Sequence, residues 1–137
     1  MRKSLFYILS LTWGIIMTTV GLLVAAVLTT IGYKPQKHGW CYYFEVGKNW
    51  GGVNLGIIFL TSENPSEHTK NHEHGHALQN CLWGPLMPFV VSIPSAMRYW
   101  KRHFQQRQGM KLEPYDSVWY EGQATMWGDI LINSLGG

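Results

Sequence analysis

Three residues near the middle of the chain have the types and the spacing of a metal site. His72, Glu73 and His76 form the pattern H-E-x-x-H within the stretch NHEHGHA, residues 71–77. Residues four apart share one face of a helix, so His72 and His76 can direct two imidazoles at one zinc ion. The carboxylate of Glu73 can take a proton from a metal-activated water. The pattern therefore predicts zinc-dependent hydrolysis with Glu73 as the general base.

A catalytic zinc needs a third protein ligand and keeps one position open. Five downstream residues carry suitable groups: His103, Glu113, Asp116, Glu121 and Asp129. Glu121 is favoured, because an acid among four large side chains (WYEGQATMW, residues 119–127) is unusual at a surface. Ala124 and Gly128 follow it at i+3 and i+7 and form a smooth stripe. Together with the small Gly75, this stripe would let two helices pack closely and bring Glu121 to the metal.

The elements that must position these residues give an α+β pattern. Residues 38–46 and 53–60 are rich in aromatic and β-branched side chains and predict two strands, joined as a β-hairpin by the turn-forming residues 47–52. A helix is expected over residues 67–82, with Ser66 as its N-cap. Gly84 and Pro85 end that helix.

Beyond the motif helix, residues 83–97 are apolar but contain three prolines. The segment is too short and broken for a regular span, and it is expected to be a re-entrant or interfacial segment or a buried loop. A short basic helix is expected over residues 98–108, and a last helix over residues 115–135. The basic cluster Arg98, Lys101, Arg102 and Arg107 is compatible with a membrane surface or with an ordinary solvated helix face.

The N-terminal segment differs sharply from the rest of the 137-residue chain. Residues 5–31 carry no charge, and 19 of these 27 residues are apolar. The run exceeds the apolar region of a cleaved signal peptide and predicts an uncleaved, tilted transmembrane helix. We therefore expect an anchor over residues 1–33 and one small domain over residues 34–137. A slight excess of positive charge at the N-terminus favours an extracytoplasmic domain.

Charge and cysteine content limit the classes of function. The chain has 11 Lys and Arg against 8 Asp and Glu, without the concentrated basic face that nucleic acid would require. Its expected partners are a peptide or protein substrate and a membrane. Two cysteines, Cys41 and Cys81, allow one disulfide or two free thiols, and the sequence does not decide between them.

The motif and the later glutamate resemble zincin metallopeptidases of the gluzincin type. The resemblance covers residues 53–133, and it implies a minimal zincin-like domain with His72, His76 and Glu121 as zinc ligands. It also implies that the strand VNLGIIFL, residues 53–60, lines the cleft and pairs with an extended peptide. Many gluzincins have an Asp four residues after the third ligand that supports a ligand histidine. Thr125 stands at that position here. The string EHGHALQNCLWGPLMPFVVSIPS, residues 73–95, is also similar to small bacterial membrane proteins with an H-E-x-G-H helix.

Two other functional classes remain open at this point. A non-catalytic membrane protein could use the zinc site structurally, as an interaction module. A pore-forming or lysis protein would use the N-terminal segment and residues 83–97, but it leaves the histidine and glutamate pattern unexplained. The leading prediction is a membrane-anchored zinc metallopeptidase.

Overall fold

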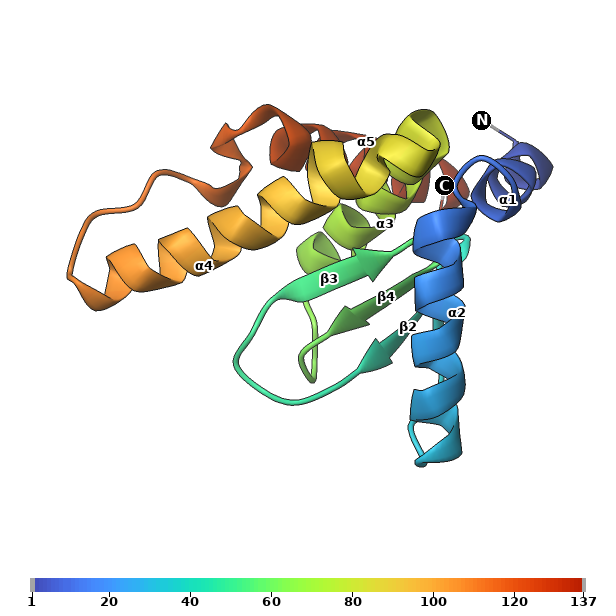
Figure 1. Ribbon diagram of the computed structural model, residues 1–137, viewed down its shortest axis with the longest axis horizontal. Coiled ribbons are helices and arrows are strands. Elements are labelled where there is room, and N and C mark those ends of the chain that lie inside the picture. The colour runs from blue at the N-terminus through green and yellow to red at the C-terminus, as the bar shows by residue number, and fades with distance from the viewer. Residues whose placement is uncertain (1, 137) are drawn as a thin grey trace.

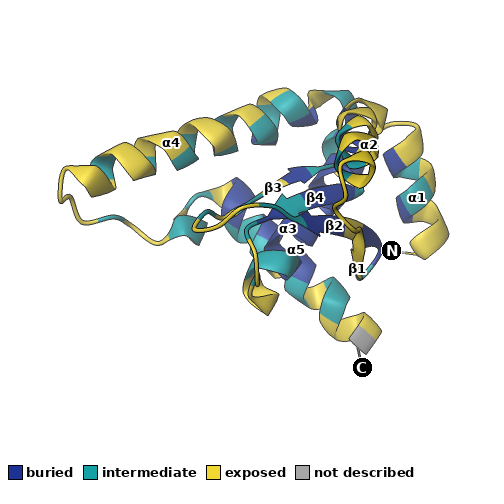
Figure 2. Ribbon diagram, turned by 90° about the horizontal axis from the view of Figure 1, so that it is seen from below, coloured by how far each residue is buried: buried dark blue, intermediate teal, exposed yellow. Residues whose placement is uncertain are grey.

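The computed structural model describes residues 2–136 and shows a mixed α+β fold (Figure 1). Its regular elements are α1 (Lys3–Leu11), α2 (Ile15–Thr30), β1 (Gln36–His38), β2 (Cys41–Glu45), β3 (Gly52–Leu55), β4 (Ile58–Thr61), α3 (Glu67–Trp83), α4 (Ile93–Arg107) and α5 (Trp119–Gly136). Figure 2 shows the sheet between α2 on one side and α3 with α5 on the other. The α+β class expected from the sequence is confirmed.

The four strands form one sheet in the order β1-β2-β4-β3. The sequence predicted that residues 38–46 and 53–60 pair as a hairpin, and this prediction is wrong. Strand β2 pairs with β4 in parallel, with Tyr42 opposite Ile58, and the hairpin is formed by β3 and β4. The chain leaves β2 for the edge of the sheet and then returns to insert β4 between β2 and β3. Strand β3 is therefore an edge strand.

A tight turn splits the stretch that was expected to be one strand. Gly56 has a φ of 73°, in the left-handed region that favours glycine. The side chain of Asn54 donates to the carbonyl of Gly56 (2.9 Å) and accepts from its amide (2.9 Å). The same Asn54 amide also donates to the backbone carbonyl of Glu73 (3.0 Å), which ties the turn to the motif helix. The apolar pattern of this stretch did not reveal the turn, because both strands are largely apolar.

Helix α3 lies at the centre of the fold. Ser66 caps it as predicted, because its Oγ accepts from the amide of Thr69 (3.1 Å), and Gly84 follows its end. Every residue from Asn71 to Cys81 is buried, although most of them are polar. Gln79 and Asn80 are fully buried and hydrogen bonded to Tyr120 and Gly14 respectively. This largely polar helix is therefore enclosed by neighbouring elements, which its sequence pattern does not show.

Helices α3 and α5 approach each other closely at two glycines. A Cβ on Gly75 would overlap the carbonyl oxygen of Ala124, and a Cβ on Gly128 would overlap that of Asn71. Among the described elements, these two helices share the most extensive packing. The close packing predicted from Gly75, Ala124 and Gly128 is therefore present.

The sequence predicted one continuous helix over the uncharged N-terminal segment. The structure does not show this continuous helix. The segment is divided into α1 and α2, which are bent by 89° at the break. Among residues 2–136, no single helix has the length and apolarity of a membrane span, although the bent pair together has both. The membrane anchor therefore stays a prediction.

Helix α1 also belongs to the core of the domain. Phe6 is fully buried in a cluster with Trp40 and Leu78, and the Tyr7 hydroxyl donates to the carbonyl of Trp40 (2.6 Å). Cys81 contacts this helix through Ser10 (3.5 Å). Cys81 and Cys41 are both buried free thiols, the alternative that the sequence left open beside a disulfide.

The proline-containing segment after α3 is helical rather than a loop. A 3-10 turn over Gly84–Leu86 and a π-helical turn over Pro88–Ser92 lead directly into α4. The basic helix therefore begins at Ile93 rather than residue 98, with Pro94 in its first turn. Figure 1 shows α4 extending away from the rest of the molecule.

Candidate metal centre

The motif residues lie together inside the molecule. His72, Glu73 and His76 are each 5 % exposed, and each offers one ligand atom within 4.8 Å of the other two. The rings of His72 and His76 lie one helical turn apart, with centroids separated by 4.8 Å. This His-Glu-His cluster is compatible with a bound metal ion.

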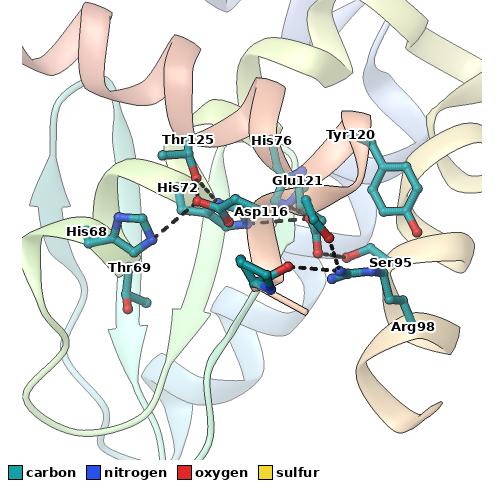
Figure 3. Close-up of polar contacts among 12 residues, drawn as sticks. His68, Thr69, His72, His76, Ser95, Arg98, Asp116, Tyr120, Glu121 and Thr125 are labelled. Atoms are coloured by element: carbon teal, nitrogen blue, oxygen red, sulfur yellow. Dashed lines mark hydrogen bonds and ion pairs between the residues drawn. The ribbon is translucent and has the colours of Figure 1, made fainter. Parts of the chain in front are cut away.

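Glu121 reaches this cluster from the first turn of α5. Its side chain is fully buried, and its Oε1 lies 2.9 Å from His76 Nε2 and 3.5 Å from His72 Nε2. Figure 3 shows Glu121 between the two imidazoles and the side chain of Ser95, which donates to its Oε2 (3.1 Å). The predicted proximity of Glu121 to both histidines is therefore present in the structure.

The hydrogen bonds on the far side of each imidazole leave both Nε2 atoms facing Glu121. His76 Nδ1 lies 2.7 Å from Gln79 Oε1, which can only accept, because the Gln79 amide nitrogen donates to Tyr120. His72 Nδ1 lies 2.8 Å from Thr125 Oγ1. Each neutral ring with its proton on Nδ1 therefore directs an Nε2 lone pair at a carboxylate. Such an arrangement requires a proton or a cation between the groups.

Three buried atoms at this point have no hydrogen-bond partner among residues 2–136. They are His72 Nε2, Glu73 Oε2 and Glu121 Oε1, and the last of these has only its close approach to the two imidazoles. A buried acceptor without a partner is costly, so native sites of this kind are commonly completed by an ion or water. Two imidazole nitrogens and a carboxylate oxygen are also the donor set that zinc accepts. The residues present therefore fit a metal ion.

The electrostatics of the cluster favour a positive charge. Burial by itself raises the pKa of Glu121, but contacts with His72 and His76 outweigh it and hold that pKa well below its usual range. Burial lowers the pKa of His76, yet Glu121 and Glu73 together raise it above its ordinary value. Burial raises the pKa of Glu73, despite the opposing charges of the histidines. Glu73 is thus a stronger proton acceptor than an exposed glutamate.

Asp116 supports His72 through Thr125. Because a carboxylate only accepts, Thr125 Oγ1 donates to Asp116 Oδ2 (2.7 Å), and its oxygen then accepts from His72 Nδ1 (2.8 Å). Figure 3 shows the three side chains close together. From the sequence, Asp116 was a candidate only as a third ligand, and this supporting role was not predicted. Thr125 was the residue that could have revealed this role, because it stands where related motifs have an aspartate. A threonine hydroxyl that accepts from a histidine still has its own proton to donate, and therefore needs an acceptor such as Asp116.

Removing the Thr125 hydroxyl is expected to weaken metal binding. In Thr125→Ala, His72 loses the partner that fixes its tautomer and ring orientation, and Asp116 loses its donor. Loss of such a supporting contact typically lowers metal affinity about 10- to 100-fold. Zinc affinity is measured by competition with a chromophoric chelator. Thr125→Ser is the control that keeps the hydroxyl and should keep the affinity. Unchanged affinity in Thr125→Ala would contradict the supporting role.

The remaining candidate ligands lie elsewhere. Asp129 accepts from the Asn71 side chain (3.0 Å), the backbone carbonyl of Glu113 accepts from Arg102 (2.6 Å), and His103 is exposed on α4. His68 is on the rim, with its Nε2 3.8 Å from Asp116.

His74 lies off the face of α3 that carries His72 and His76. It is fully buried, and its Nε2 accepts from the amide of Trp40 (3.0 Å). Burial lowers the pKa of His74 to about 4, so this histidine is neutral at physiological pH.

An apolar cavity of about 350 Å³ opens beside the cluster. Glu73 and His76 line it together with the edge strand β3, the start of α4 and Tyr115. Its apolar walls include Met17, Met87 and Val91. The strand expected to line a cleft therefore does so through β3, and a ligand in the cavity would contact both Glu73 and an unpaired strand edge.

The chain was also compared with known protein families, curated proteins and solved structures. No protein-family model, no curated protein and no solved structure matches the chain.

Proposed function

We propose that the chain is a membrane-associated, zinc-dependent peptidase. The observation that carries the proposal is the convergence of His72, His76 and Glu121 beside Glu73, where buried atoms lack hydrogen-bond partners among residues 2–136. In this proposal the first three residues hold zinc and Glu73 is the general base. The assignment also agrees with the resemblance to gluzincin-type motifs.

Each protein group has a defined task in the proposed reaction. A bound zinc ion supplies Lewis acidity, which polarises a peptide carbonyl and lowers the pKa of water. Glu73, whose pKa is raised by burial, accepts the proton of the attacking water and returns it to the leaving amine. Thr125 and Gln79 keep the two imidazoles oriented. The fully buried Glu121 is held by Ser95.

The shape of the cavity favours an extended peptide as substrate. Strand β3 is the edge of the sheet, so its outer backbone groups are available to pair with an added strand. The cavity that β3 lines with Glu73 and His76 would take an apolar side chain of that peptide. The peptide bond would then lie near the general base.

Removal and return of metal test this function. Full-length protein treated with a chelator should lose cleavage of a peptide library, and one equivalent of zinc per chain should restore it. Peptides with large apolar side chains should be cleaved first. A chain that binds zinc and unfolds on chelation, but cleaves nothing in the library at any zinc level, would support the structural role and reject the peptidase.

A further inference from the structure

A stripe of large, exposed apolar side chains runs from the π-helical turn before α4 along α4 itself. Its members are spaced by four, four, three and four residues, which places them on one face of a helix: Phe89, Ile93, Met97, Trp100 and Phe104. Each is between 49 % and 70 % exposed, and α4 itself has no buried residue. Figure 2 shows this helix exposed or of intermediate exposure along its length.

The positive charges of α4 divide into two groups. Arg98 and Arg102 turn back onto residues 113–117, where they donate to backbone carbonyls and lie over the ring of Tyr115. Lys101 and Arg107 are exposed and form no ion pair within residues 2–136. At about 100° per residue, Lys101 borders one side of the stripe and Arg107 the other side near its end. The helix contains no acidic residue.

We propose that α4 is an interfacial helix that lies on an anionic lipid bilayer. The apolar stripe would enter the boundary between headgroups and acyl chains, and the unpaired cations beside it would reach anionic headgroups. Trp100 has the amphipathic ring that concentrates at this depth. An uncharged partner surface would satisfy the stripe but would leave both cations without a counter-charge.

This placement has a consequence for the candidate metal centre. Tyr99 and Trp100 also line the cavity beside Glu73 and His76. With α4 on a bilayer, the cavity would open next to the lipid surface, within reach of peptides held there. The docking of α4 itself depends on neither metal nor catalysis, so it can fail or hold independently of the proposed peptidase.

A fluorescent probe on α4 tests the docking in the full-length protein. NBD is attached to Phe104→Cys on the stripe or to Gln106→Cys on the opposite, exposed face, and the parent chain with its two buried cysteines gives the labelling background. In vesicles of phosphatidylcholine with phosphatidylserine, emission at position 104 should rise several-fold and shift to the blue, while position 106 should stay unchanged. Vesicles of phosphatidylcholine alone should give a smaller rise.

A charge variant separates lipid docking from other causes. Lys101→Gln with Arg107→Gln should weaken the docking equilibrium roughly 30-fold, at about 1 kcal/mol per cation near an anionic surface. Lys37→Gln with Lys48→Gln, an equal charge change outside α4, should leave it unchanged. Equal responses at 104 and 106, or no effect of the α4 charge variant, would overturn the proposal. If NBD emission at position 104 rose without lipid and increased with protein concentration, the stripe would instead be assigned to contact with a second copy of the chain.

Discussion

Replacing Glu73 with glutamine is expected to abolish peptide cleavage while zinc stays bound. The amide keeps the size of the side chain but cannot accept a proton from water. Positioned general bases contribute about 10²- to 10⁴-fold to rate, so cleavage should fall by at least two orders of magnitude. Zinc content per chain, measured by elemental analysis, should stay the same, because the proposed ligands are His72, His76 and Glu121.

Two comparisons make this prediction specific. Glu67→Gln changes an exposed glutamate at the start of the same helix and should leave cleavage unchanged. Glu121→Gln should reduce the zinc content itself, because it removes a charged ligand rather than a base. If Glu73→Gln cleaved the peptides at the parent rate, the assignment of the general base would be rejected even with zinc in place.

A methyl group at Gly75 is expected to separate the two helices that carry the site. Helix propensity alone would make Gly75→Ala stabilising by up to about 1 kcal/mol. The added Cβ would instead meet the backbone carbonyl of Ala124, which cannot rotate away as a side chain can. Overpacking of this kind costs about 1–3 kcal/mol and sometimes more. We therefore expect a net loss of unfolding free energy, measured by urea denaturation, and weaker zinc binding as α5 carries Glu121 away.

Other glycines of the chain provide the comparison. Gly128→Ala approaches the same interface from α5, where its Cβ would meet the carbonyl of Asn71, and it should cost a similar free energy. Gly51→Ala places its Cβ in open space and should change stability little. If Gly75→Ala were as stable as the parent chain, the close packing of α3 on α5, and with it the position of Glu121, would be incorrect.

Local signals predicted the motif helix and its neighbours well. Ser66, Gly84 and the absence of proline placed α3 within one residue, because caps and helix stops act over a few residues. The stripe beside Glu121 predicted the packing of α5 on α3, since close approach of two helices requires small side chains on both. The prediction of strand pairing was wrong because pairing depends on contacts between segments and not on local signals. Two apolar stretches do not specify their neighbours in a sheet, and Gly56 alone did not reveal the turn.

The sequence by itself determined which residues can do chemistry and on which helical faces they lie, because spacing along a helix sets direction. Only the tertiary structure decided which other residues contact and support these side chains. The link from Asp116 through Thr125 to His72, and the burial of polar residues along α3, arise from contacts between segments far apart in the chain. The break of the uncharged segment into α1 and α2 likewise goes with tertiary contacts, since it places Phe6 in the core cluster and the Tyr7 hydroxyl on the carbonyl of Trp40.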